Sequence, residues 1–444
     1  MKPFIVIQGP VATRSGYGNH TRDLVTSLIR ADKYEIVIIS LPWGSTPGDA
    51  LKKDNPEHEA IIKCIATSDI NQRPDIFIQI SVPNEFKPMG KYNIGITAGI
   101  ETNQVSPEFL EGSNRMDLLI TTSEHSKEGF VKTTYDAVDK NTNQKTSELR
   151  LEKPIEVLFE GIDTNVYKKT KQISPTIITE MEQIKDDFCF LFVGHWLKGN
   201  LGQDRKDIGM LIRAFAETFK NKAGRNKPAL ILKTSSATFS IIDRDELSKK
   251  IQSILSPFGH KAPNVYLLHG DLTDEEMNSL YNHTKIKSMI SFTKGEGFGR
   301  PLLEFTATGK PVIAPSWSGH VDFLKDYSIL LPGSLTDVDA SAADKFLLKG
   351  SKWFTVDYGY AMRIIKDVTE NYKKYLDNSR KQMTHTNKNF TLDIMAEKFV
   401  TIVDKGLKEV PQQMELRLPK LKKVEDAKIE APKLKLPKLK KIEI

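Results

Sequence analysis

Runs of consecutive apolar residues recur along the first 160 residues, and amphipathic stretches separate them. Continuous apolar runs are typical of parallel strands that are covered on both faces. The stretch 19–31 between the first two runs has its apolar residues on one helical face. The pattern therefore predicts a doubly wound α/β domain. Its strands are predicted at 4–7, 36–41, 75–80, 93–97, 118–122 and 156–159.

The same pattern starts again near Phe188 and includes an amphipathic helix at 207–220. Two successive βα series predict two Rossmann-like domains, joined near 163–175. Ligands of such folds bind at the carboxyl ends of the strands, so we expect a site in the cleft between the domains. The second series of strands is predicted at 188–193, 229–234, 265–269, 288–292 and 312–314.

The amino-acid composition limits which classes of protein this chain can belong to. The chain has 444 residues, 39% hydrophobic and 27% charged, which predicts packed cores rather than wholesale disorder. No apolar run approaches the length of a membrane span, and the apolar run among the first residues is too short for the hydrophobic region of a secretory signal. The two cysteines, Cys64 and Cys189, exclude a disulfide scaffold and a cysteine metal site. We therefore expect a cytoplasmic protein.

The net charge of +7 is concentrated at the C-terminal end. Residues 411–444 contain ten Lys or Arg and five Asp or Glu, and the octet 418–425 recurs nearly unchanged at 436–443. Frequent prolines forbid a continuous helix there, so we expect a disordered or extended tail. A polyanionic partner is most readily expected at this tail. A solvated tail without a partner is the alternative.

A glycine-rich loop carries the clearest chemical signal. The stretch 295–309 follows a predicted strand, Pro301 suits the first position of a helix, and Gly309 suits its left-handed cap. Free amides at such a helix start can hold phosphate or sugar oxygens. Two glutamates, Glu296 and Glu304, flank this start, and carboxylates accept hydrogen bonds from hydroxyl-rich ligands.

The spacing of Glu296 and Glu304 resembles the Glu-x7-Glu signature of retaining glycosyltransferases of family 4, which have the GT-B fold. Other segments resemble that family in the expected order along residues 1–405. They are Gly16-Tyr-Gly18 after the first strand, the stretch 160–167 that begins Glu-Gly-Ile-Asp, the stretch 193–196 followed by Arg205-Lys206, and the loop 269–272.

The resemblance implies a role for each segment. Glu296 would hold the transferred sugar and Glu304 the ribose hydroxyls, while Arg205 and Lys206 would hold the donor diphosphate. The amides of Phe298, Gly299 and Arg300 would line the sugar and phosphates. The nucleobase would lie at Leu272, and the N-terminal glycine loop contains Gly16 and Gly18. His195 stands where the family usually has Arg, which makes that phosphate contact dependent on pH.

A departing diphosphate requires positive charge from a metal or from side chains. No convincing Asp-x-Asp metal motif follows a strand, so Arg205 and Lys206 would supply that charge and no metal or cofactor is expected. Glu101 follows a predicted strand, and it could orient the acceptor hydroxyl or accept its proton, with a helix-capping role as an equal alternative. We therefore take Glu296 and Glu101 as the candidate catalytic residues.

The predicted organisation follows. Residues 1–168 form the acceptor domain, 169–390 the nucleotide-sugar domain, 391–410 a helix that packs back toward the first domain, and 411–444 the tail. The polar stretch 136–153 is expected as a surface loop. No membrane anchor is expected, and the oligomeric state is left open.

The predicted activity is that of a retaining hexosyltransferase that uses a nucleotide-sugar, with a UDP-sugar favoured. A hydroxylated base in DNA is a candidate acceptor. A glycan or lipid-linked acceptor at a membrane surface is the alternative. Two further hypotheses are less favoured. One is an epimerase or phosphorylase of the same fold, and the other is a non-catalytic module that binds a nucleotide-sugar.

Overall fold

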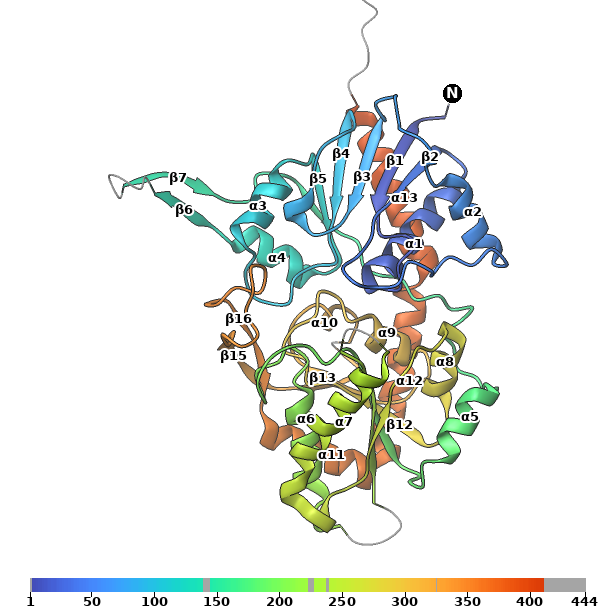
Figure 1. Cartoon of the computed structure of the whole chain (residues 1–444), viewed down its shortest axis with the longest axis vertical. Helices are drawn as coiled ribbons and strands as arrows, with labels where there is room; N and C mark the ends of the chain where they lie inside the picture. The colour runs from blue at the N-terminus through green and yellow to red at the C-terminus, as the bar shows by residue number, and fades with distance from the viewer. Residues whose placement is uncertain (1, 139–143, 223–226, 237–238, 325, 411–444) are drawn as a thin grey trace, which may run out of the picture. The chain divides into compact units, whose positions relative to one another are not determined.

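The computed structural model describes residues 2–138, 144–222, 227–236, 239–324 and 326–410. Its first half is built on a six-stranded parallel sheet with strand order β2-β1-β3-β4-β5-β8 (Figure 1). All six predicted strands are present. They are β1 (Phe4–Gly9), β2 (Glu35–Ser40), β3 (Ile76–Ile80), β4 (Tyr92–Ile96), β5 (Leu118–Thr121) and β8 (Ile155–Val157).

Helices connect these strands and cover the sheet, as the alternation of patterns predicted. α1 begins at Gly16, three residues before the predicted start, because the Ser15 side chain accepts a hydrogen bond from the amide of Gly18 and caps the helix. The helices of this domain are α1 (Gly16–Ala31), α2 (Pro56–Cys64), the 3₁₀ turn η1 (Pro83–Glu85), α3 (Pro107–Asn114) and α4 (Glu124–Lys132).

A second six-stranded parallel sheet has the order β11-β10-β9-β12-β13-β14. It contains the five strands predicted for the second half and one further strand. These are β9 (Cys189–Val193), β10 (Ala229–Lys233), β11 (Val265–Leu268), β12 (Ile286–Ile290), β13 (Val312–Pro315) and β14 (Ile329–Leu331). The two sheets and their helices confirm an α/β architecture of two Rossmann-like domains.

The helices of the second half surround its sheet. They are α5 (Pro175–Glu182), α6 (Ile208–Phe219), α7 (Ile241–Leu255), the 3₁₀ segment η2 (Ser256–Lys261), α8 (Asp274–Asn282), α9 (Arg300–Thr306), α10 (Val321–Leu324), α11 (Tyr358–Glu370) and α12 (Tyr372–Asn389). Pro301 occupies the second rather than the first position of α9, because Gly299 is the N-cap. Gly309 has a left-handed φ of +69°, but the helix ends before it, at Thr306.

The prediction of a surface loop at 136–153 was wrong. Strands β6 (Tyr135–Val138) and β7 (Lys145–Leu149) pair there as an antiparallel hairpin. Most of their side chains are exposed, so no apolar face marks them as strands in the sequence, and backbone pairing alone defines the hairpin. A second hairpin, β15 (Gly333–Asp337) and β16 (Lys352–Val356), extends from the second domain.

Helix α13 (Leu392–Glu409) packs against α1 of the first domain. The Asp404 carboxylate accepts hydrogen bonds from Lys33 Nζ at 2.9 Å and from the Tyr34 hydroxyl at 2.6 Å. Residues 1–410 form one contact unit, and the predicted tail, 411–444, lies outside the described residues. The domain boundaries at 168 and 390 stay predictions.

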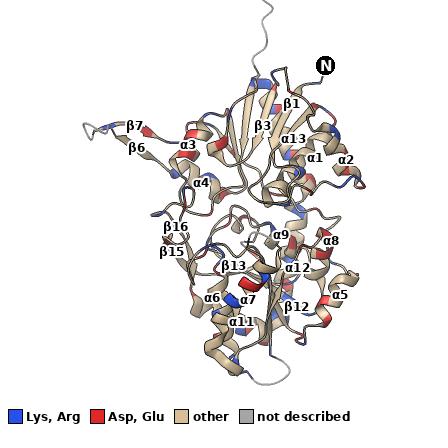
Figure 2. Ribbon diagram, viewed as in Figure 1, with Lys and Arg blue, Asp and Glu red and all other residues tan. Residues whose placement is uncertain are grey.

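Two further properties concern the distribution of charged and apolar residues. Basic and acidic residues are interspersed over the elements of both domains (Figure 2). Among the described residues, no helix is both long and apolar enough to cross a membrane.

Candidate active site

The predicted donor-site segments lie where the strand order of the second sheet reverses. β9 and β12 are neighbours in space, and their connections leave in opposite directions. At such a switch point the loops after the two strands diverge and leave room for a ligand. Residues 194–206 follow β9 and residues 291–299 follow β12, so the topology brings together two segments about 90 positions apart.

The glycine loop packs directly against the backbone of the first domain. A Cβ atom added to Gly295 would lie 1.9 Å from the Glu101 carbonyl oxygen, and one added to Gly297 would lie 2.0 Å from the Ala98 carbonyl oxygen. The Ser123 hydroxyl donates a hydrogen bond to the Gly297 carbonyl at 2.6 Å. Only glycine permits this approach, so both glycines are required for contact between the domains.

Glu296 is the centre of a charged cluster. Its side chain is 12% exposed and pairs with the ammonium group of Lys206, and one Arg205 Nη lies 3.3 Å from its other oxygen. Burial alone would raise the pKa of Glu296, but the positive charges of Lys206 and Arg205 outweigh it and lower the pKa to about 2. The carboxylate is therefore ionised at neutral pH, and it holds both cations in place.

Glu101 and His195 belong to the same cluster. The Glu101 carboxylate lies 3.7 Å from Arg205 Nη1, across the boundary between the domains. The His195 ring approaches the Ser235 hydroxyl at 3.1 Å. Partial desolvation and the positive charge of Lys206 lower the pKa of His195, so its imidazole is neutral at pH 7. A phosphate contact from His195 would be a neutral hydrogen bond.

Glu304 anchors a second cluster, one turn into α9. Its carboxylate accepts hydrogen bonds from Arg300 Nε at 3.0 Å and from the Tyr281 hydroxyl at 3.3 Å. Burial raises the pKa of Glu304 to about 7, although Arg300 opposes this. Arg300 also donates to Asp23 Oδ2 of α1 at 2.6 Å, so one guanidinium joins the two domains.

The other predicted donor contacts are less direct. The amide of Gly18 already donates to Ser15, while Gly16 has open space where a Cβ would lie. The Phe298 ring is buried against Phe323, so only its backbone could face a ligand. Leu272 is partly buried and packs on the apolar core.

Two further buried groups lie near Arg300. The sequence prediction missed Glu160 as a site residue, and for His20 it left open a phosphate contact or a surface position on the helix, of which the burial of His20 excludes the surface position. Glu160 is 8% exposed and has no hydrogen-bond or ion-pair partner among the described residues, yet its charge interacts with Arg300, Asp23 and Glu296. His20, which is 1% exposed, also lies near Arg300, and neither of its ring nitrogens has a partner in the described chain. Glu160 is the first residue of the stretch 160–167 that resembles family 4, and this was the available signal in the sequence.

Burial raises the pKa of Glu160 to about 7, and this shift predicts that the stability of the folded protein depends on pH. The unfolded carboxyl titrates near 4.5, so the folded protein binds the extra proton and loses stability as the pH rises from about 4.5 through 7. Glu160→Gln keeps the shape of the neutral acid, and we expect its Tm to exceed that of the parent at pH 8 but to match it at pH 5. Thermal unfolding at both pH values, with Glu156→Gln as control, tests this; the same Tm difference at both would contradict it.

The architecture is shared with solved glycosyltransferases. The structure of Alr3699/HepE from Anabaena with UDP and glucose matches with a TM-score of 0.55 at 14% identity, over 91% of this chain and 100% of that one. Sucrose-phosphate synthase from Thermosynechococcus elongatus matches at 0.59 and 11% identity, over 92% and 100%. A glycosyltransferase from Rickettsia africae matches at 0.59 and 12% identity, over 92% and 99%. The fold is GT-B.

No protein-family model matches the sequence, and no curated protein matches it either. The GT-B fold therefore rests on the structural likeness. In the part of the chain that the structure describes, no three His, Cys, Asp or Glu side chains are grouped to hold a metal ion.

Proposed function

We propose that this protein is a retaining glycosyltransferase, similar to family 4, that transfers a hexose from a UDP-sugar. One observation carries the proposal. Glu296, Lys206 and Arg205 form a nearly buried cluster beside the glycine loop, at the switch point of the second sheet. Charged groups held together at such a point are typical of a ligand site rather than of a stabilising ion pair.

The chemistry follows from the charges. Cleavage of the bond between sugar and diphosphate leaves negative charge on the departing phosphate, and Lys206 and Arg205 would stabilise it. Glu296 would then exchange one cation for the hydroxyls of the sugar. Glu101, on the opposite domain, lies 3.7 Å from Arg205 and would orient the acceptor hydroxyl. We propose front-face attack with retention, in which the leaving phosphate takes the acceptor proton.

The direct test is calorimetric titration of the full chain with UDP, followed by mass spectrometry of mixtures with separate nucleotide-sugars. We expect UDP to bind and one UDP-hexose to be hydrolysed or transferred. Absence of binding to UDP and to every other nucleoside diphosphate would refute the proposal. Binding without turnover of any sugar would favour the non-catalytic module.

If the two cations replace a metal, activity should persist in excess EDTA, because the diphosphate charge is then balanced by protein groups. Initial rates with and without EDTA measure this. Complete inactivation that manganese or magnesium reverses would contradict the metal-independent mechanism. The matched control is the same protein after EDTA has been removed by gel filtration.

We propose that the acceptor is a hydroxylated base in DNA and that the protein works in the cytoplasm, where its two free cysteines would stay reduced. The support for DNA is the composition of the tail, whose two lysine clusters can each neutralise phosphates. If about five lysines contact duplex DNA, log affinity should fall with log salt at a slope of about −4.5.

Truncation after Val410 should remove most non-specific DNA binding, which a filter-binding or anisotropy assay measures. Donor hydrolysis should stay unchanged, because Glu296 and Glu304 lie in the remaining chain. Equal DNA affinity of the truncated and full chains at low salt would contradict this role. Binding of the full chain to anionic vesicles instead would favour a lipid-linked acceptor.

A further inference from the structure

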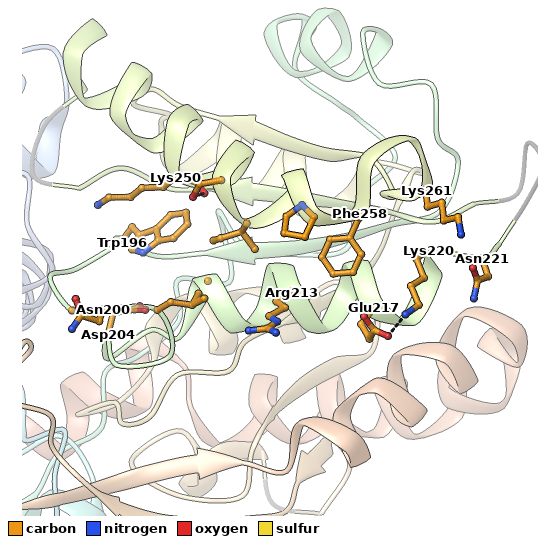
Figure 3. Close-up of a pocket in the computed structure, with 16 residues that line it drawn as sticks. Trp196, Asn200, Asp204, Arg213, Glu217, Lys220, Asn221, Lys250, Phe258 and Lys261 are labelled. Atoms are coloured by element: carbon orange, nitrogen blue, oxygen red, sulfur yellow. Dashed lines mark hydrogen bonds and ion pairs between the residues drawn. The ribbon is translucent and has the colours of Figure 1, made fainter.

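A groove on the second domain lies apart from the charged clusters described above. It runs between α6 on one side and α7 with η2 on the other (Figure 3). Its volume is about 750 Å³, within the range of small-molecule sites. Leu201, one of the residues that line it, is 50% exposed.

The floor of the groove is apolar. Trp196 and Leu201 come from the loop after β9, and Ile254, Pro257 and Phe258 come from the end of α7 and from η2. Trp196 is 6% exposed and lies between the two walls in Figure 3. An apolar or aromatic body would remove this surface from water.

The walls carry two basic side chains that form no ion pair with the described residues. Arg213 projects from α6 and Lys250 from α7, with the Lys250 ammonium group 5.7 Å from the centre of the Trp196 ring. Neither cation has an ion pair with any described residue, whereas Lys220, farther along α6, pairs with Glu217. Arg213 therefore presents a free guanidinium, whose planar donors match a carboxylate or phosphate.

The positive charge is confined to a few side chains of the groove. This favours a small anionic ligand over an acidic peptide helix that would lie along the whole groove. Asp204 and Glu217 also line the groove and would repel carboxylates spread along its length. Figure 3 shows Lys250 beside Trp196 at one end of the groove and Arg213 on the opposite wall, farther along α6. One anionic group held by either cation, with an apolar body on Ile254, Pro257 and Phe258, satisfies both features.

The groove shares a loop with the proposed donor site. Trp196 and Asp204 line the groove, and their immediate neighbours, His195 and Arg205, belong to the cluster around Glu296. A ligand that moves this loop from the groove side therefore changes the position of the phosphate-binding cations. This link rests on the proposed function, whereas binding in the groove does not.

We propose that the groove is an effector site for a small organic anion with an apolar body, and that its occupancy alters donor affinity through the loop 195–206. The probe is 8-anilinonaphthalene-1-sulfonate, an aromatic body with one anionic group, titrated by fluorescence into the full chain. Its neutral analogue N-phenyl-1-naphthylamine has the same body without the charge.

We expect the double variant Arg213→Ala, Lys250→Ala to bind the sulfonate about tenfold more weakly or worse, because neither wall then offers a cation without an ion pair for a charge-assisted contact. Lys249→Ala is the matched control: it removes an exposed lysine of the same helix that does not line the groove. The neutral analogue should bind the parent more weakly than the sulfonate and should not distinguish the variants.

Saturating sulfonate should change the Kd for UDP about fivefold or more without direct competition. Complete displacement of the sulfonate by UDP, equal binding by parent and double variant, or an equal loss in Lys249→Ala would overturn the site. An unchanged Kd for UDP would overturn the effector role. Failure of the protein to bind UDP would refute the proposed function, and the variant series would still decide on the groove.

Discussion

If the protein uses a UDP-hexose as proposed, with UDP-glucose the first to be assayed, Lys206→Ala is expected to lower kcat about 10²–10³-fold, the usual effect of removing one preorganised group that stabilises charge in a transition state. Lys206 is 13% exposed, and no other described lysine pairs with Glu296. Its charge would act in a poorly hydrated site, where electrostatic stabilisation is strongest. Steady-state kinetics over a range of UDP-glucose concentrations separates this effect from a change in KM.

Lys198→Ala is the control for this variant. Lys198 lies on the same loop, is 56% exposed and pairs only loosely with Asp344, at 3.6 Å. It should retain parental kcat. Thermal unfolding is measured in parallel, since the loss of Lys206 removes one of the two cations that pair with the buried Glu296 carboxylate, and a buried charge with fewer partners destabilises the fold. A parental kcat in a folded Lys206→Ala protein would contradict the assigned role.

The parallel sheets were predictable because their strands are buried on both faces and read as unbroken apolar runs. The strand Cys189–Val193, for example, is nearly all buried, as its sequence Cys-Phe-Leu-Phe-Val indicates. The hairpin of β6 and β7 was not predictable in this way, because its exposed side chains leave no apolar period. Helix ends depended on single caps such as Ser15, which shifted the start of α1.

The charged cluster was predictable because its members occur in short segments after strands. Glu296, Arg205 and Lys206 follow β12 and β9, and strand order brings these ends together. The partners of Arg300 were not predictable. Asp23 lies 277 positions away on α1, and only the packing of the two domains places its carboxylate at the guanidinium. The spacing of residues within a short segment of sequence cannot indicate a contact between residues so far apart.

The proposed contact between Glu304 and the ribose leads to the other large effect that we expect. If Glu304 holds the ribose, Glu304→Ala should weaken binding of UDP-glucose by about 1.5–3 kcal/mol, or roughly 10- to 150-fold, because the ribose hydroxyls would lose a charged acceptor. Calorimetry measures this directly. Glu275→Ala, which removes an exposed glutamate of α8, should bind like the parent. Equal affinity of Glu304→Ala and parent would contradict the ribose assignment.

The pH dependence makes this test specific to the carboxylate. The pKa of Glu304 is raised to about 7 in the protein without ligand, and the ionised form is the better acceptor for two hydroxyls. Affinity for UDP-glucose should therefore rise with pH through about 7, with release of a proton on binding. Glu304→Gln cannot ionise, so its affinity should be lower at pH 8 and nearly independent of pH between 6 and 8. A parental pH dependence in Glu304→Gln would show that another group, such as Glu160, is responsible.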